Sequence, residues 1–153
     1  MTTNQIEDRE NPTMPLTIES SRFGALQVPA EDVIEFPLGL IGLDGSRYTL
    51  LDRNPGTGFL WLHSLEDPSL ALPVVDPRRF FSAFELSLTE EERERIGVDP
   101  ASAQVYVTVR AAADPSEVVV NLRAPLLVAE GCGHQVLNTA PDAALQAPLF
   151  STA

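Results

Sequence analysis

The chain has 153 residues, 44% hydrophobic and 21% charged, a composition typical of one soluble globular domain. Its 22 acidic residues outnumber ten basic residues, and the net charge of −12 argues against direct binding to DNA or RNA, which requires cations that neutralise phosphates. No apolar run reaches the roughly 18 residues of a membrane helix, and the single cysteine permits no internal disulfide. We therefore expect a cytoplasmic protein that makes no contact with a membrane.

The two ends of the chain differ in composition from its middle. Residues 1–14 are polar, interrupted by proline and without periodicity, which predicts a disordered N-terminal tail. Residues 141–153 are rich in alanine and proline and are expected to form a loose C-terminal tail. Between them, proline and glycine are spread along the chain rather than gathered in a linker, so residues 15–140 are predicted to form a single domain.

Short apolar or alternating segments, each bounded by proline or glycine, predict β-strands in the first half of the chain. They are a hairpin over 16–28 that turns near Gly24, followed by strands over 32–36, 48–51, 59–64 and 70–75. The connecting loop 37–45 contains three glycines, but their spacing matches no phosphate-binding motif.

One helix is predicted, between Thr89 and Gly97. Thr89 and Glu92 have the spacing of a capping box, in which each side chain accepts a hydrogen bond from the backbone N–H of the other residue. Consecutive glutamates on a helix point about 100° apart, so the acidic run 90–94 is interpreted as a solvated face rather than a metal site.

The second half of the chain again predicts strands, over 104–109, 118–122, 126–128 and 135–137, with a turn over 131–133. Pro125 fixes φ and lacks an N–H, so it is predicted to form a corner between two of these strands. About ten short strands with one helical insert predict an all-β fold, an antiparallel β-barrel that is closed or nearly closed.

The residues offer little for catalysis. His63 is expected on a buried strand, on the same face as Trp61, and His134 lies in a hairpin two residues after Cys132. Cys132 and His134 are too few ligands for a metal site, and no positive group near the thiol would activate it as a nucleophile. We predict no catalytic, metal or cofactor site. The alternatives are a small-ligand barrel, a minor hydrolase that uses His63 or His134, or a structural β-domain that only oligomerises.

Three motifs, taken in order and spacing, resemble the FliW family of flagellar assembly factors. The first is residues 36–43 (FPLGLIGL), the second runs over 59–81, and the third is residues 120–125 (VNLRAP). The third matches the family's signature of Asn-Leu, a basic residue and Ala-Pro. The resemblance extends over about residues 16–149.

The resemblance implies a non-enzymatic β-barrel protein that binds flagellin in the cytoplasm. Many members of the family also bind CsrA, a small RNA-binding translational repressor, and keep it from silencing flagellin mRNA. Secretion of flagellin then frees the family member to sequester CsrA. An acidic surface would suit a basic RNA-binding partner. The free protein is expected to be a monomer.

The motif positions are the candidate partner-contacting residues. They are His63, Ser64, Asp76, Pro77, Asn121, Arg123 and Pro125. At Asn121, Arg123 and Pro125 a structural role is given at least equal weight: Asn121 would satisfy backbone groups at a strand end, and Pro125 would set the corner.

Overall fold

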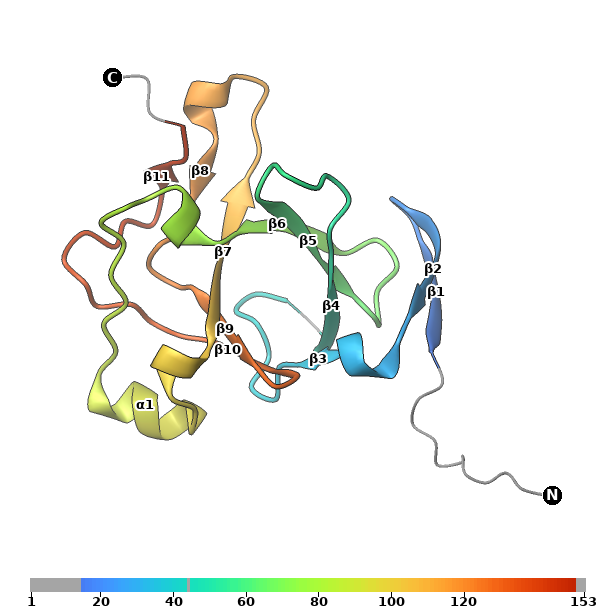
Figure 1. The fold of residues 1–153 in the computed structure, drawn as a ribbon, viewed down its shortest axis with the longest axis horizontal. Helices are drawn as coiled ribbons and strands as arrows, with labels where there is room; N and C mark the ends of the chain where they lie inside the picture. Colours follow the sequence, from blue (N-terminus) through green and yellow to red (C-terminus); the bar gives the residue numbers. More distant parts are fainter. Residues whose placement is uncertain (1–14, 44, 151–153) are drawn as a thin grey trace.

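The computed structural model describes residues 15–43 and 45–150, and among them it shows eleven strands and one α-helix (Figure 1). The strands are β1 (Leu16–Ser20), β2 (Gly24–Val28), β3 (Ile34–Glu35), β4 (Arg47–Leu51), β5 (Phe59–Ser64), β6 (Ala71–Val75), β7 (Gln104–Arg110), β8 (Val119–Val120), β9 (Leu126–Ala129), β10 (Cys132–Gln135) and β11 (Ala147–Pro148). The helix, α1, spans Glu90–Ile96. No helix among the described residues has the length and apolar character needed to cross a membrane. The all-β prediction is confirmed.

Seven strands close into a barrel in the order β3, β4, β5, β6, β7, β9 and β10 (Figure 1). Neighbours in this ring are antiparallel except β10 and β3, which are parallel where Cys132 pairs with Glu35. The sequence predicted an entirely antiparallel barrel, so this pairing is a correction. Its cause is the odd number of strands: when seven strands alternate in direction around a closed ring, the first and the last must run the same way.

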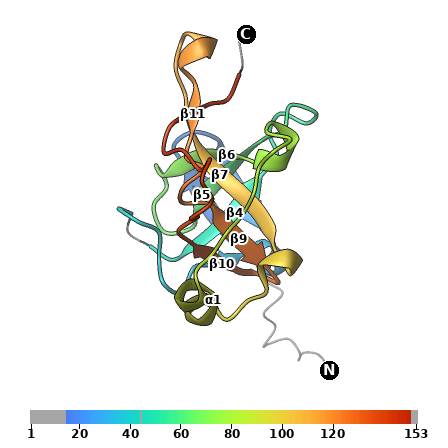
Figure 2. The same ribbon diagram turned by 90° about the vertical axis from the view of Figure 1, so that its left-hand side faces the viewer.

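Two pairs of strands extend the barrel. The β1–β2 hairpin forms a separate two-stranded sheet on one side of it (Figure 1), and β8 and β11 continue the sheet from the C-terminal end of β7. In the view turned by 90°, β11 lies at the end of the molecule opposite α1 (Figure 2). The barrel is therefore a scaffold with the helix at one end and the β8–β11 extension at the other.

The described part of the predicted C-terminal tail, residues 141–150, is packed rather than loose. Ala143, Ala147 and Leu149 are at most 7% exposed and belong to the same core cluster as Val120. Their small apolar side chains fit closely against β8, a pattern that an alanine- and proline-rich composition conceals. The predicted tail over 1–14 and residues 151–153 lie outside the described residues.

The hairpin between β9 and β10 turns earlier than predicted. Glu130 and Gly131 have φ angles of 52° and 78°, both in the left-handed region that a two-residue type I′ turn requires. Cys132 therefore pairs with Ala129, and β10 covers Cys132–Gln135 instead of residues 135–137.

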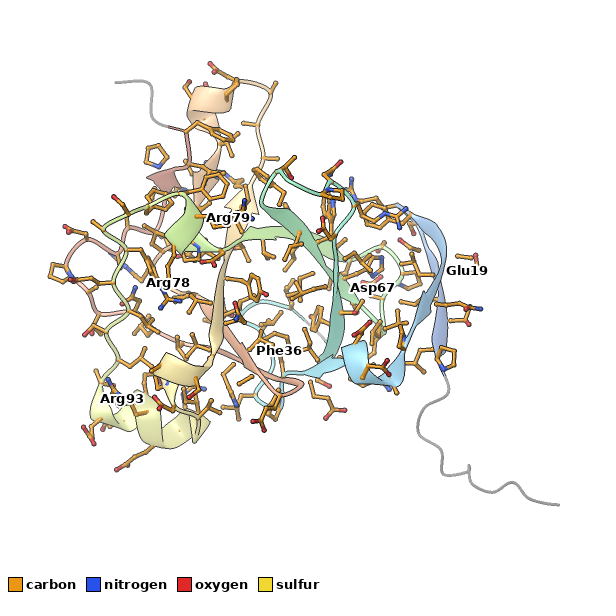
Figure 3. All side chains as sticks on the ribbon, in the orientation of Figure 1. Glu19, Phe36, Asp67, Arg78, Arg79 and Arg93 are labelled. Atoms are coloured by element: carbon orange, nitrogen blue, oxygen red, sulfur yellow. The ribbon has the colours of Figure 1, made fainter. Side chains whose placement is uncertain are left out.

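Phe36 lies in the centre of the barrel (Figure 3), where it is completely buried. Its ring meets that of Tyr48 in a T-shaped contact with centroids 5.5 Å apart. Leu62, Val74 and Leu126, from three other strands, belong to the same cluster, together with Ile34 and Leu40. A second cluster packs β7, β8 and β11 together, and a third lies beneath α1.

Helix α1 is held to the barrel by its third residue. The hydroxyl of Thr89 accepts a hydrogen bond from the backbone N–H of Glu92 at 3.1 Å, as the capping box predicted. The Glu92 carboxylate does not return this contact; it accepts instead from Nε of Arg95 at 2.7 Å and from the backbone N–H of Leu137 at 2.8 Å. Arg95 also donates to the carbonyl of Gln135 at 2.9 Å. The ion pair thus fastens the segment 135–137 to the helix.

Replacing Glu92 with glutamine is expected to lower the free energy of unfolding by about 1 kcal/mol, because charge-assisted hydrogen bonds are lost. The hydrogen bond from Arg95 is the main cause that holds the pKa of Glu92 below its ordinary value. A depressed carboxylate pKa stabilises the fold above the unfolded-state pKa, and this contribution disappears as the pH falls through the folded-state value.

Urea denaturation at neutral pH and at about pH 3 measures this difference. The gap between the wild type and Glu92→Gln should shrink at the acid pH. Glu94→Gln removes an exposed glutamate of the same helix and should cost less than half as much at neutral pH. If the difference in unfolding free energy between the wild type and Glu92→Gln were equal at both pH values, the ionised Glu92 carboxylate would not be the source of this stability.

Candidate partner-binding site

His63 and Ser64, two candidate contact residues at the end of β5, are both completely buried. Nδ1 of His63 contacts the carbonyl of Ser64, and Nε2 contacts the hydroxyl of Ser20, each at 2.7 Å. Because Ser20 is the last residue of β1, this contact anchors the β1–β2 hairpin to the barrel. A serine and a histidine at this distance act as nucleophile and base only where a substrate reaches them, and here both are buried.

Asp76 and Pro77 turn the chain out of the barrel after β6. A carboxylate oxygen of Asp76 accepts from the backbone N–H of Arg78 at 2.9 Å and so caps the 3₁₀ turn Pro77–Arg79. Pro77 is buried at the first position of the turn, where no N–H is needed. Arg78, labelled in Figure 3, then lies 5.8 Å from the ring centroid of Phe84.

Asn121 organises the third motif as a turn after β8. Its side-chain carbonyl accepts from the backbone N–H groups of Arg123 at 3.0 Å and of Ala124 at 3.2 Å, an Asx-type turn. This is the structural role that the sequence offered for Asn121. It also explains why β8 ends at Val120 and not at residue 122 as predicted.

Pro125 and Arg123 lie on opposite sides of this turn. Pro125 is buried, and its carbonyl accepts from the backbone N–H of Val136 at 3.0 Å, which continues the β9–β10 pairing. The bend between β8 and β9 lies at residues 122–124, directly before this proline. Arg123 is exposed, with Nε 3.4 Å from the carbonyl of Ala143. Of the third motif's charged and polar side chains, the Arg123 guanidinium is therefore the one that most readily reaches a partner.

Cys132 and His134 lie side by side at the start of β10, with 3.5 Å between Sγ and Nε2. Among the described residues, Nδ1 of His134 is the one buried side-chain nitrogen or oxygen atom without a hydrogen-bond partner. Burial, aided by the positive charge of Arg95, lowers the pKa of His134 and favours the neutral ring. No group of three or more His, Cys, Asp or Glu side chains converges as a metal site within the described part of the chain.

A largely apolar groove of about 600 Å³ opens where residues 40–43 meet β7, β8 and the segment 145–146. Its apolar walls come from several parts of the chain that are far apart in the sequence. They include Leu40, Ile41, Leu43, Leu72, Val109, Val120, Leu126, Leu137 and Leu145. Ile41, Leu137 and Leu145 are 75%, 52% and 55% exposed, and they form the rim. Exposed apolar side chains gathered in this way are typical of interaction surfaces.

Arg110 and Arg123 are the charged residues among the described residues that line the groove. Of the seven candidate contact residues, the structure brings Asn121 and Arg123 to this groove and leaves the other five outside its lining. Sequence reasoning missed Ile41 and Arg110. Apolar residues in a glycine-rich loop, where polar turn residues are usual, were the signal that could have found Ile41.

The family model described as FliW protein matches residues 17–149. The chain belongs to the FliW family. The flagellar assembly factor FliW of Geobacter sulfurreducens is 35% identical over 112 residues, which cover 72% of this chain and 70% of that protein. That of Natranaerobius thermophilus is 30% identical over 141 residues, which cover 89% and 93%. A crystal structure of the flagellar assembly factor FliW has the same fold, with a TM-score of 0.77 and 24% identity over 88% of this chain and 97% of that one.

Membership of the FliW family confirms the resemblance on which the sequence interpretation rested. All three motifs, far apart in the sequence, contribute residues to the groove. The first motif supplies Leu40, Ile41 and Leu43, and the third supplies Asn121 and Arg123. The remaining FliW-like segment, over 59–81, mainly builds β5 and β6 and contributes Leu72 to the same lining.

Proposed function

We propose that this FliW-family chain binds flagellin in the cytoplasm and antagonises the translational repressor CsrA in a partner switch. The supporting observation is the family match over residues 17–149, together with relatives that are named flagellar assembly factors. Flagellin stays bound to the chain until the flagellin is secreted, and the freed chain then sequesters CsrA. The chain acts by binding rather than by catalysis, and it is a monomer when free.

The charge of the chain supports a basic partner such as an RNA-binding repressor. The net charge is −12, and the glutamates 90, 91 and 94 are exposed on α1. Complementary charges accelerate association more than they increase affinity. Because salt screens exposed charges beyond about 8 Å at physiological ionic strength, the association rate with CsrA is expected to fall as salt is raised.

Mixing experiments with purified components test both parts of the proposal. Flagellin from the same organism should form a stoichiometric complex with the chain on size exclusion and give a saturable isotherm by calorimetry. The chain should release CsrA from flagellin mRNA, and added flagellin should reverse the release. An unrelated protein of similar negative charge serves as the control.

Each part can fail separately. A chain that forms no complex with flagellin at micromolar concentration would overturn the flagellin part. RNA that stays bound to CsrA would overturn the antagonist part. An association rate with CsrA that does not change with salt would remove the electrostatic argument.

A further inference from the structure

Among the described residues, those that line the groove carry a positive charge, opposite to that of the molecule as a whole. The chain has 22 acidic residues, yet the described residues that line the groove include two of the ten arginines and no aspartate or glutamate. The side chain of Arg110 is exposed and makes no hydrogen bond or ion pair with any described residue. A guanidinium beside an apolar surface, with no partner among the described residues, is well suited to hold a carboxylate through two parallel hydrogen bonds.

The walls of the groove are held in place by contacts between separate segments. The side-chain oxygen of Gln135 accepts from the backbone N–H of Ile41 at 2.7 Å, and its nitrogen donates to the carbonyl of Ala124 at 3.1 Å. Glu92 holds the backbone of Leu137 from the other side. A surface fixed before binding loses less conformational entropy when a partner arrives.

We propose that the groove receives an apolar segment of the partner protein that carries a carboxylate. The apolar side chains of that segment cover Ile41, Leu137 and Leu145, and its carboxylate pairs with Arg110. The inference rests on the proposed function, in which the partner is flagellin. A basic repressor would be repelled by Arg110, so the groove belongs to flagellin and CsrA docks on another, acidic face.

Two groove variants and two matched controls test this assignment by calorimetry with purified flagellin from the same organism. Ile41→Asp places a charge on the apolar rim, and Leu38→Asp makes the same change at a 56% exposed residue of the same loop that does not line the groove. Arg110→Glu reverses the groove charge. Arg93→Glu makes the same change in net charge on the exposed face of α1 (Figure 3).

The groove variants are expected to weaken flagellin binding about tenfold or more, as substitutions at central interface residues do. The two controls should stay within about twofold, because surface substitutions away from an interface have small effects. Arg110→Lys should retain more affinity than Arg110→Glu. All five variants change exposed side chains, so circular dichroism and thermal unfolding should match the wild type. CsrA binding should be unaffected by Ile41→Asp.

The outcomes separate this inference from the proposed function. If the wild type binds flagellin and the groove variants bind equally well, the groove assignment is overturned and the proposed function stands. If Ile41→Asp weakens flagellin binding but Arg110→Glu does not, the proposed contact between a flagellin carboxylate and Arg110 is overturned. If the wild type binds no flagellin, the proposed function fails, and the groove assignment fails with it.

Discussion

Asn138→Leu is expected to lower the free energy of unfolding by about 4 kcal/mol, because it leaves four backbone groups without partners. Asn138 is 3% exposed. Its side-chain oxygen accepts from the backbone N–H groups of Ser87 at 2.9 Å and Ala140 at 3.1 Å. Its nitrogen donates to the carbonyls of Glu85 at 3.0 Å and Leu122 at 3.1 Å. One amide therefore ties together three segments that have no regular strand pairing between them.

Leucine has the same number and branching of non-hydrogen side-chain atoms as asparagine, so the main loss is of hydrogen bonds rather than of packing. Urea denaturation gives the difference, with Asn54→Leu, in an exposed loop, as the matched control. The control should change stability by less than about 0.5 kcal/mol. Asn138→Asp keeps the acceptor but loses both donors, and it should also be strongly destabilised. A cost below about 1 kcal/mol for Asn138→Leu would show that water replaces the four hydrogen bonds.

Most of the barrel could be predicted from the sequence because turn-forming residues mark the ends of its strands. Residues 59–64 and 104–110 are apolar or alternating runs with proline, glycine or aspartate at their ends, and they form β5 and β7 close to the predicted bounds. Whether neighbouring strands run parallel or antiparallel was harder to predict from the sequence. The parallel pairing of β10 with β3 follows from the number of strands in the ring, and no local pattern reports that number.

The C-terminal segment and Asn138 show a second limit. Ala143 and Ala147 are ordinary in a loose tail by composition, and only their place against β8 makes them core residues. Asn138 follows an apolar segment like many turn residues do. Its importance comes from carbonyl and N–H groups of residues 85–87 and 122, which lie far from it in the sequence.

The groove could be predicted only in part. The third motif was found because it matches a family signature, and Arg123 within it does line the groove. His63 and Ser64 were chosen by the same reasoning, yet they are completely buried and make their contacts within the chain. Their candidate contact role stays a prediction. A motif marks residues that a family needs, and it does not separate those that shape the fold from those that face a partner.

Gly133→Ala is expected to destabilise the fold by about 3 kcal/mol, the upper range for overpacking a core. A Cβ atom at residue 133 would lie 2.5 Å from two ring carbons of Phe36. Real Cβ contacts are never this short, so the ring or β10 has to move. Phe36 is completely buried and packed edge-on against Tyr48, which leaves the ring no free direction. Unlike Gly131, Gly133 does not have a positive φ, so the expected cost comes from packing alone.

Denaturation of Gly133→Ala, Phe36→Leu, the double variant of these two and Gly24→Ala separates packing from backbone strain. Gly24 has a φ of 78° and open space where its Cβ would lie, so that variant should lose about 1 kcal/mol from the left-handed backbone alone. The shorter leucine side chain at residue 36 removes the ring carbons that would clash. The double variant should therefore lose less than the sum of the two single variants, because residues in contact couple. Strict additivity, or a Gly133→Ala cost no larger than that of Gly24→Ala, would show that β10 does not approach Phe36 this closely.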